Sequence, residues 1–157
     1  MNAEMLRHKF LGSLVGTAIG DAVGAFSEGW YGTWPETAGE MADRKSSLVY
    51  TDDTAMMIGV AESLVEKRGL DAKHMAGVFA KNYYREPYRG YGPGPPRIFQ
   101  LMMQGEAWNK AAEMIYPGGS FGNGSAMRIA PVGVLYHDSV DDLKMVAYES
   151  SRITHAH

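Results

Sequence analysis

The sequence contains no cysteine among its 157 residues. Disulfide bonds, thiolate metal sites and cysteine nucleophiles are therefore excluded. There is no excess of basic residues either: the formal net charge is −3 and the isoelectric point is about 5.9, so a nucleic acid is not an expected partner. The first ten residues, MNAEMLRHKF, lack the pattern of a signal peptide. We therefore expect a cytoplasmic location.

A long hydrophobic run is also missing. The best candidate, residues 10–26 (FLGSLVGTAIGDAVGAF), is short for a bilayer and contains Asp21, which is costly in lipid. Its small residues recur at every fourth position, a spacing that lets another backbone approach one side of a helix. We expect no membrane association and predict a buried helix in a tightly packed soluble bundle, with four glycines on one side: Gly12, Gly16, Gly20 and Gly24.

No segment alternates cleanly between polar and apolar residues, so the sequence predicts little β-sheet. Helical spacing of apolar residues is frequent instead, and the fold class expected is all-α. The chain is the size of one domain, and it shows no internal repeat or interdomain linker, so residues 1–157 are treated as part of a single domain. Helices are predicted at 4–24, 51–69, 71–82, 95–105, 106–115, 125–136 (disturbed by Pro131) and 139–147, with Thr51, Asp71 and Ser139 as N-caps.

The start of the second predicted helix carries four oxygen-bearing side chains in a row, in the stretch YTDDTAM at 50–56. One explanation is ordinary stabilisation of a helix N-terminus, which attracts carboxylates. Two adjacent aspartates repel each other, however, and a hard divalent cation with oxygen ligands would relieve that repulsion. The residues alone leave both readings open.

Two further acids bear on this choice. Asp21 lies in an otherwise apolar helix, where a buried acid must find either a cation or hydrogen bonds, including bonds from backbone N–H groups. Glu28 follows that helix in a loop, and taken alone it reads as a solvated glutamate.

Two loops and a terminal segment carry other polar chemistry. The glycine-rich stretch 118–128 (GGSFGNGSAMR) could cradle a phosphate with backbone N–H groups, although it lacks the lysine of a P-loop and could be a flexible turn. The loop 83–97, rich in tyrosine and arginine, could stack a base and hold a phosphate, or it could be a surface loop stiffened by proline. His155 and His157 could be ligands, acid–base groups or surface residues.

Taken in order, five stretches resemble the ADP-ribosylglycohydrolase family: GTAIGDAVGAFSE, YTDDTAM, EPYRGYGPG, GGSFGNGSAMRIAPVG and ITHAH, which together span nearly the whole chain. The resemblance implies an all-α fold with two Mg²⁺ ions (Mn²⁺ is possible) in a cleft that binds ADP-ribose. It also implies hydrolysis of the ADP-ribosyl bond of a modified protein or an ADP-ribose-containing small molecule. The implied site residues are Thr51, Asp52 and Asp53 for metal, Glu28 for catalysis or gating, and Gly90, Tyr91, Gly92, Gly119, Ser120, Phe121, Gly122, Asn123, Gly124 and His155 for substrate.

The sequence departs from the family in one respect. Members complete the metal site with a second Asp-x-Asp-Thr motif in their C-terminal half, and no such motif occurs in these 157 residues. The chain is therefore expected to be an N-terminal half, whose missing ligands could come from a second chain. Two alternatives follow: an ADP-ribose or nucleotide-binding module without turnover, and an inert or structural protein.

Overall fold

The computed structural model describes residues 2–25, 27–29, 32, 40, 43 and 47–157. The helices whose bounds the structure describes are α1 (Ala3–Gly24), α3 (Asp52–Lys67), α4 (Ala72–Arg85), α5 (Gly94–Met103), α6 (Trp108–Ile115), α7 (Ala130–Leu135) and α8 (Val140–Ser151). No strand occurs within these ranges, which confirms the predicted all-α class.

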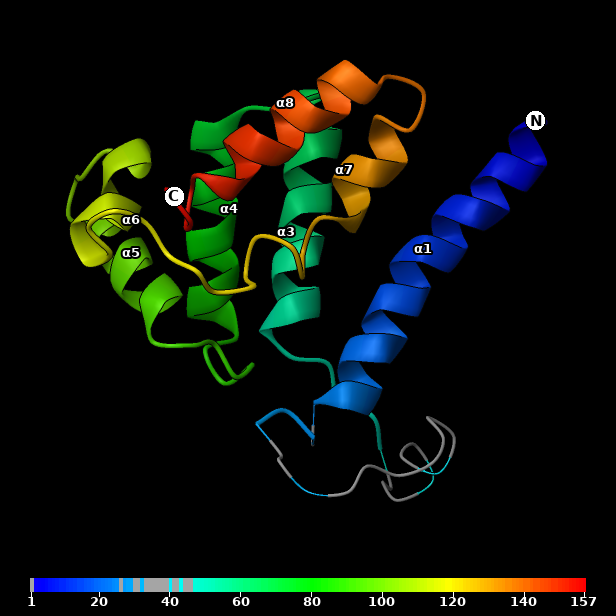
Figure 1. Cartoon of the computed structure of the whole chain (residues 1–157), viewed down its shortest axis with the longest axis horizontal. Coiled ribbons are helices and arrows are strands. Elements are labelled where there is room, and N and C mark those ends of the chain that lie inside the picture. The colour runs from blue at the N-terminus through cyan, green and yellow to red at the C-terminus, as the bar shows by residue number, and fades with distance from the viewer. Residues whose placement is uncertain (1, 26, 30–31, 33–39, 41–42, 44–46) are drawn as a thin grey trace.

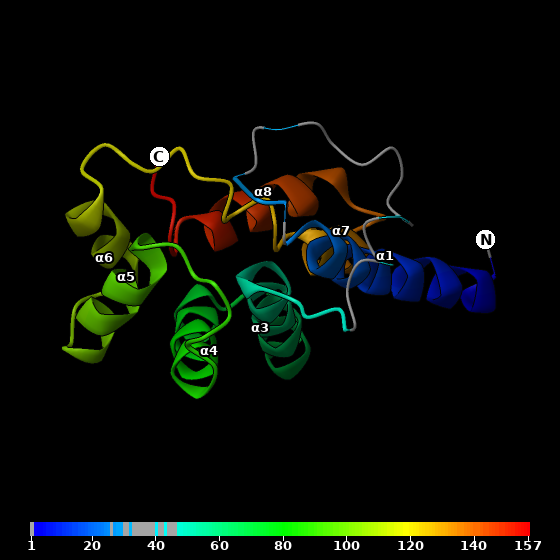
Figure 2. The ribbon, with the colours of Figure 1, turned by 90° about the horizontal axis from the view of Figure 1, so that it is seen from below.

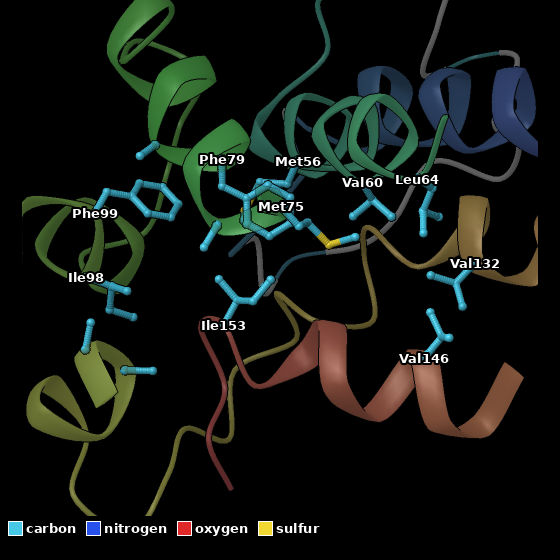
Figure 3. Close-up of a cluster of buried hydrophobic side chains, with 14 residues drawn as sticks. Met56, Val60, Leu64, Met75, Phe79, Ile98, Phe99, Val132, Val146 and Ile153 are labelled. Atoms are coloured by element: carbon cyan, nitrogen blue, oxygen red, sulfur yellow. The ribbon is translucent and has the colours of Figure 1, made fainter. Parts of the chain in front are cut away.

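Helices α3 and α4 form the centre of the molecule. Figure 2 shows α3, α4 and α5 side by side with α7 and α8 across one side of them, and α6 packs on α5. The core lies between these layers (Figure 3) and includes Val60 from α3, Phe79 from α4 and Phe99 from α5, each at most 2% exposed. Apolar residues at helical spacing thus give each helix one buried face.

Helix α1 differs from its prediction. None of its described residues is buried, Leu11 and Ile19 are 57% and 54% exposed, and a Cβ on any of the four glycines would meet nothing within 4 Å. Figure 1 shows α1 at one end of the molecule, with its N-terminal turns extending away from the other helices; α1 contacts α3 and α7. The prediction of a buried helix is therefore wrong for this chain, because no described element lies against the glycine side.

Two other helix boundaries differ from the prediction. Helix α4 continues to Arg85, so Tyr83 and Tyr84 belong to a helix rather than to the loop 83–97. The helix predicted at 125–136 is reduced to α7, and residues 124–128 form turns. Pro131 explains this, because a proline lacks an N–H donor and is tolerated in the first turn of a helix but not in its interior.

Local capping follows the sequence closely. The predicted N-caps Thr51, Asp71 and Ser139 each accept a backbone N–H bond at the start of their helix. Among the described residues, no helix is long and apolar enough to cross a membrane.

Candidate functional site

A cleft of about 220 Å³ lies where four parts of the chain meet: the residues after α1, the N-terminus of α3, the start of α5 with the loop before it, and the glycine-rich loop 118–124 with the residues that follow α8. It brings together residues that are up to 127 positions apart in the chain, from Glu28 to His155. Ten of the residues singled out from the sequence line it: Glu28, Asp52, Asp53, Gly90, Gly92, Ser120, Gly122, Asn123, Gly124 and His155.

The N-terminus of α3 is held by an acid from another helix. The carboxylate of Asp21, near the end of α1, accepts four hydrogen bonds: from the hydroxyls of Thr51 and Thr54 at 2.6 Å each, and from their backbone N–H groups at 2.9 and 3.1 Å. Backbone donors at a helix start normally need such a partner. The structure therefore supports the reading of Asp21 as a structural acid satisfied by hydrogen bonds.

The bond to Asp21 also determines which further contacts the Thr51 hydroxyl can make. Its hydroxyl proton is used in the bond to Asp21 Oδ1, so the remaining contacts of the oxygen are made with lone pairs. One lone pair faces the N–H of Asp53 at the long distance of 3.4 Å. Thr51 lies beside the main cleft, in an adjoining hollow of about 300 Å³ that Asp21, Glu28 and Asp53 also line. Its oxygen is thus available as an acceptor next to the two aspartates.

Asp52 and Asp53 are partly buried and lie in a negative environment. Burial and then the charge of Asp53 raise the pKa of Asp52 to about 6, and Glu28 and Asp21 add to the effect. Burial, followed by the charges of Asp21 and Glu28, also raises the pKa of Asp53. Without a cation, the folded chain therefore works against the ionisation of both carboxyls.

The donor set suits a hard divalent cation, since it consists of carboxylate and hydroxyl oxygens whose mutual repulsion a cation would relieve. It forms only part of a ligand shell, however. Within the ranges that the structure describes, no three histidine or acidic side chains come together closely enough to hold a metal ion. The residues present fit half of a metal site, with Thr51, Asp52 and Asp53 as its donors.

The raised pKa of Asp52 predicts an unusual pH dependence. Its folded-state pKa of about 6 lies above the ordinary value near 4, so between about pH 4 and pH 6 the folded chain keeps a proton that the unfolded chain has lost. The protonated carboxyl therefore leaves the free energy of unfolding undiminished at pH 4, and that free energy falls as the pH rises through 6 and Asp52 ionises in the folded chain. In the absence of divalent ions, Asp52→Asn is expected to be more stable than the unsubstituted chain by about 1–2 kcal/mol at pH 7, a value reduced for the solvent screening of a partly buried carboxyl, and by little at pH 4.

Urea denaturation in a chelator at both pH values measures this difference. Asp141→Asn is the matched control, because Asp141 is an exposed aspartate in the first turn of α8. A constant difference between Asp52→Asn and the unsubstituted chain across this pH range would contradict the prediction.

The loop between α4 and α5 is fixed against the segment that precedes α3. Arg89 forms an ion pair with Glu86 at 3.1 Å, donates to the carbonyl of Tyr50 at 3.2 Å, and places its guanidinium 3.6 Å from the centre of the Tyr50 ring. Arg89 is therefore occupied within the protein, which favours the structural interpretation of this loop over phosphate binding. With Arg89 held in this way, the next residue, Gly90, lies close to the side chains of Thr51 and Asp52: a Cβ on Gly90 would be 4.0 Å from an atom of each.

Three of the predicted substrate residues lie outside the lining of the cleft. Tyr91 packs edge-on against Tyr83 at the border of the core. The ring of Phe121 is 89% exposed and lies 4.5 Å from the ring of His157. Gly119 has a φ of 100°, and a Cβ there would collide with the backbone of His157.

Other residues of the cleft were not singled out from the sequence. Tyr116 is the most informative, since a Cβ on Gly94 would lie 2.7 Å from its ring, so a glycine at this point lets the ring approach the start of α5. The position of Tyr116 directly before the Pro-Gly-Gly stretch was a usable signal. The remaining lining residues are Pro93, Gly94, Pro95, Ile98, Met127 and Thr154.

Comparison with known proteins places this arrangement in a family. The family model described as ADP-ribosylglycohydrolase matches residues 2–157. The chain is 37% identical to chicken (Gallus gallus) and 34% identical to human ADP-ribosylhydrolase ARH3, in each case over 94% of this chain and 45% of the relative. It is 28% identical to the ADP-ribosyl-[dinitrogen reductase] glycohydrolase of Rhodospirillum rubrum, over 100% of this chain and 54% of that protein.

The chain thus spans about half the length of the curated relatives that it matches. The match nevertheless runs through all five stretches on which the resemblance rests. The protein belongs to the ADP-ribosylglycohydrolase family.

Proposed function

We propose that this chain supplies one half of a divalent-metal site and most of a substrate cleft for hydrolysis of an ADP-ribosyl bond at the anomeric carbon of the distal ribose. The similarity to ADP-ribosylhydrolase ARH3 and to ADP-ribosyl-[dinitrogen reductase] glycohydrolase supports the reaction class. The main support for a metal requirement is the pair Asp52 and Asp53. Burial and neighbouring acids disfavour the ionisation of both carboxyls, and a bound cation would relieve this.

The reaction joins a water oxygen to the anomeric carbon and breaks the bond from that carbon to the acceptor. A proton passes from the water to a base, and the acceptor takes up a proton as it leaves. Glycosidic cleavages of this kind have a transition state resembling an oxocarbenium ion. Mg²⁺ or Mn²⁺, when bound, would orient ribose hydroxyls and make a water acidic enough to attack at neutral pH.

Different residues of the chain would bind the metal, accept the proton and bind the phosphates. Thr51, Asp52 and Asp53 would hold metal from the N-terminus of α3. Glu28 lines both the cleft and the adjoining hollow, and its exposed carboxylate is the best placed described side chain to accept a proton from the water. The backbone around Gly122 and Gly124 would receive the phosphates, because glycine lets a ligand approach the backbone closely. The N–H of Gly122, which donates to the Ser120 hydroxyl at 3.2 Å, would exchange that bond for one to a phosphate oxygen.

We also propose that a further segment carrying Asp-x-Asp-Thr completes the site, from the same protein or from a second chain. Two observations support this. The described residues assemble only part of a ligand shell, and α1, next to the acids, leaves Leu11, Val15 and Ile19 on its surface with exposed fractions of 45% or more. An apolar helix surface of this kind is typical of a contact with another part of a protein.

Release of ADP-ribose from an ADP-ribosylated peptide, with Mg²⁺ and with a chelator, tests the proposal. We expect Mg²⁺-dependent release when the completing segment is present, and mass spectrometry of the purified material shows whether a second polypeptide accompanies the 17.2 kDa chain. The absence of release with both parts present would refute hydrolysis.

A second candidate function is ADP-ribose binding without turnover. It is favoured by the presence of Ser120, Gly122, Asn123, Gly124 and His155 together in the cleft lining, whereas only part of a metal site is present among the described residues. Calorimetry with ADP-ribose separates the two functions, because a binding module gives heat of binding but releases no product.

A further inference from the structure

Arg128 is a buried cation that neither metal binding nor hydrolysis explains. It lies in the turn between the glycine-rich loop and α7, and it is 1% exposed. Burial lowers its pKa to about 9. In the part of the chain covered by the structure, no carboxylate forms an ion pair with it. A buried charge without a counter-ion is expensive and persists only when its hydrogen bonds are satisfied.

The guanidinium is held by neutral groups. Its Nη1 donates to the hydroxyl of Thr154 at 2.8 Å, and its Nη2 donates to the carbonyl of Ser150 at 3.0 Å. One face of the group lies 4.7 Å from the centre of the Phe79 ring, a cation–π contact. Nη1 also approaches the sulfur of Met56 at 3.8 Å. These partners fix the orientation of the guanidinium.

The bond to Thr154 has a consequence for the next residue. A guanidinium can only donate, so the Thr154 oxygen accepts from Arg128 and its own proton must be donated elsewhere. The oxygen lies 2.7 Å from Nδ1 of His155. Thr154 is 1% exposed, so water cannot take the proton, and no other acceptor contacts this hydroxyl among the described residues. Thr154 therefore donates to Nδ1.

A neutral imidazole that accepts at Nδ1 carries its proton on Nε2. Burial, and then the charge of Arg128, lower the pKa of His155 to about 4, so the ring is neutral near pH 7. The Nε2 atom would lie 3.3 Å and 3.2 Å from a Cβ built on Gly122 and Gly124, and both glycines line the cleft. The N–H edge of the ring thus lies beside the glycine-rich loop.

We infer that Arg128 is a positioning residue that acts through the Thr154 hydroxyl to fix His155 as the neutral Nε2–H tautomer, so that the cleft receives an N–H donor beside the glycine-rich loop. A donor at this place selects an acceptor oxygen, such as that of a phosphate or a ribose hydroxyl. The identity of that ligand rests on the proposed function. The tautomer does not, because it follows from contacts within the chain.

The test is NMR of the ¹⁵N-labelled chain near pH 7, using long-range correlations that separate a protonated from an unprotonated ring nitrogen. His155→Gln identifies the His155 signals among those of the five histidines. We expect Nδ1 of His155 to have the shift of an unprotonated nitrogen and Nε2 that of a protonated one. Thr154→Val removes the hydroxyl at nearly constant shape and is expected to give a mixture of tautomers, whereas Thr154→Ser keeps the hydroxyl and is expected to keep the tautomer.

Arg128→Met tests the role of the bond from Arg128 to Thr154, because methionine has a similar length but lacks the hydrogen-bond donors of arginine. It is expected to give a tautomer mixture and a raised pKa of His155. If this variant does not fold, Thr154→Val still decides the question. A proton on Nδ1 in the unsubstituted chain, or an unchanged tautomer in Thr154→Val, would overturn the inference.

Calorimetry with ADP-ribose adds a readout of the donor. Thr154→Val is expected to bind ADP-ribose at least about twofold more weakly than Thr154→Ser, because the apparent affinity falls in proportion to the fraction of rings that carry the proton on Nε2. Equal affinity of the two variants, despite a changed tautomer, would overturn the donor role. Failure of the unsubstituted chain to bind ADP-ribose counts against the proposed function instead, and the ligand-free NMR result then decides the inference about Arg128.

Discussion

Replacing both Asp52 and Asp53 with asparagine is expected to reduce Mg²⁺-dependent release of ADP-ribose about a thousandfold or more. Asparagine keeps the size of each side chain but removes the negative charge that holds a divalent cation. A bound cation contributes several kcal/mol to stabilisation of a transition state, and about 1.4 kcal/mol corresponds to a factor of ten in rate. The measurement is the initial rate of release by the chain together with the segment that completes its site.

The sequence offers a matched control in Asp141 and Asp142, a second pair of adjacent aspartates in the first turn of a helix. Both are exposed and lie outside the cleft, so the same double substitution there should leave the rate within about twofold, as is usual for surface changes. Calorimetric titration with Mg²⁺ supplies an independent readout. Undiminished release by the Asp52 and Asp53 double variant would refute the role of these residues in metal binding.

Loss of rate and gain of stability are expected together in this variant. Because the neighbouring acids and burial disfavour two charges at the N-terminus of α3, neutral side chains should stabilise the metal-free chain at pH 7. Unfolding therefore cannot explain a loss of activity if denaturation shows the variant to be at least as stable as the unsubstituted chain.

Phe79→Ala is expected to destabilise the chain by about 3–5 kcal/mol, the usual cost of removing a buried aromatic ring. Phe79 is 2% exposed and lies in the middle of the core in Figure 3. Its ring packs against Gly59, where a Cβ would come within 2.9 Å of the ring. The guanidinium of Arg128 lies over the same ring, 4.7 Å from its centre. The cavity left by alanine would thus border a buried charge, and the cost should lie towards the upper part of that range.

Phe121→Ala makes the same chemical change at a ring that is 89% exposed. Its effect on the free energy of unfolding should be within about 0.5 kcal/mol, as for other surface substitutions. Urea denaturation of both variants, followed by circular dichroism, gives the comparison. Similar free energies of unfolding for the two variants would show that the core is not centred on α3 and α4.

Local signals in the sequence predicted the helices well. A capping side chain and the apolar spacing behind it depend on residues within one or two turns, so the starts of α3, α4 and α8 could be read directly from Thr51, Asp71 and Ser139. The same local reasoning failed at 125–136, where the apolar pattern suggested a longer helix than Pro131 permits. It also failed for the surroundings of α1, because glycine spacing predicts close approach of a partner but does not show that the partner belongs to the same chain.

The candidate site was predicted in part. The motifs identified the residues, and ten of them line one cleft. The links between motifs could not be read from the sequence: the bonds from Asp21 to Thr51 span 30 positions, and the bond from Arg128 to Thr154 spans 26. Such contacts depend on how the helices pack. If a helix turned about its axis by one residue, its side chains would point in other directions and these bonds could not form.

By itself, the sequence determined the all-α class, the starts of α3, α4 and α8, the family and the set of polar residues available for chemistry. Tertiary structure alone decided which acids lie close enough to raise each other's pKa, which face of α1 is left uncovered by the described residues, and that a buried arginine bonds to the threonine beside His155. The physical reason is that capping and periodicity act over a few residues, whereas burial and charge interactions depend on distances in space between distant parts of the chain.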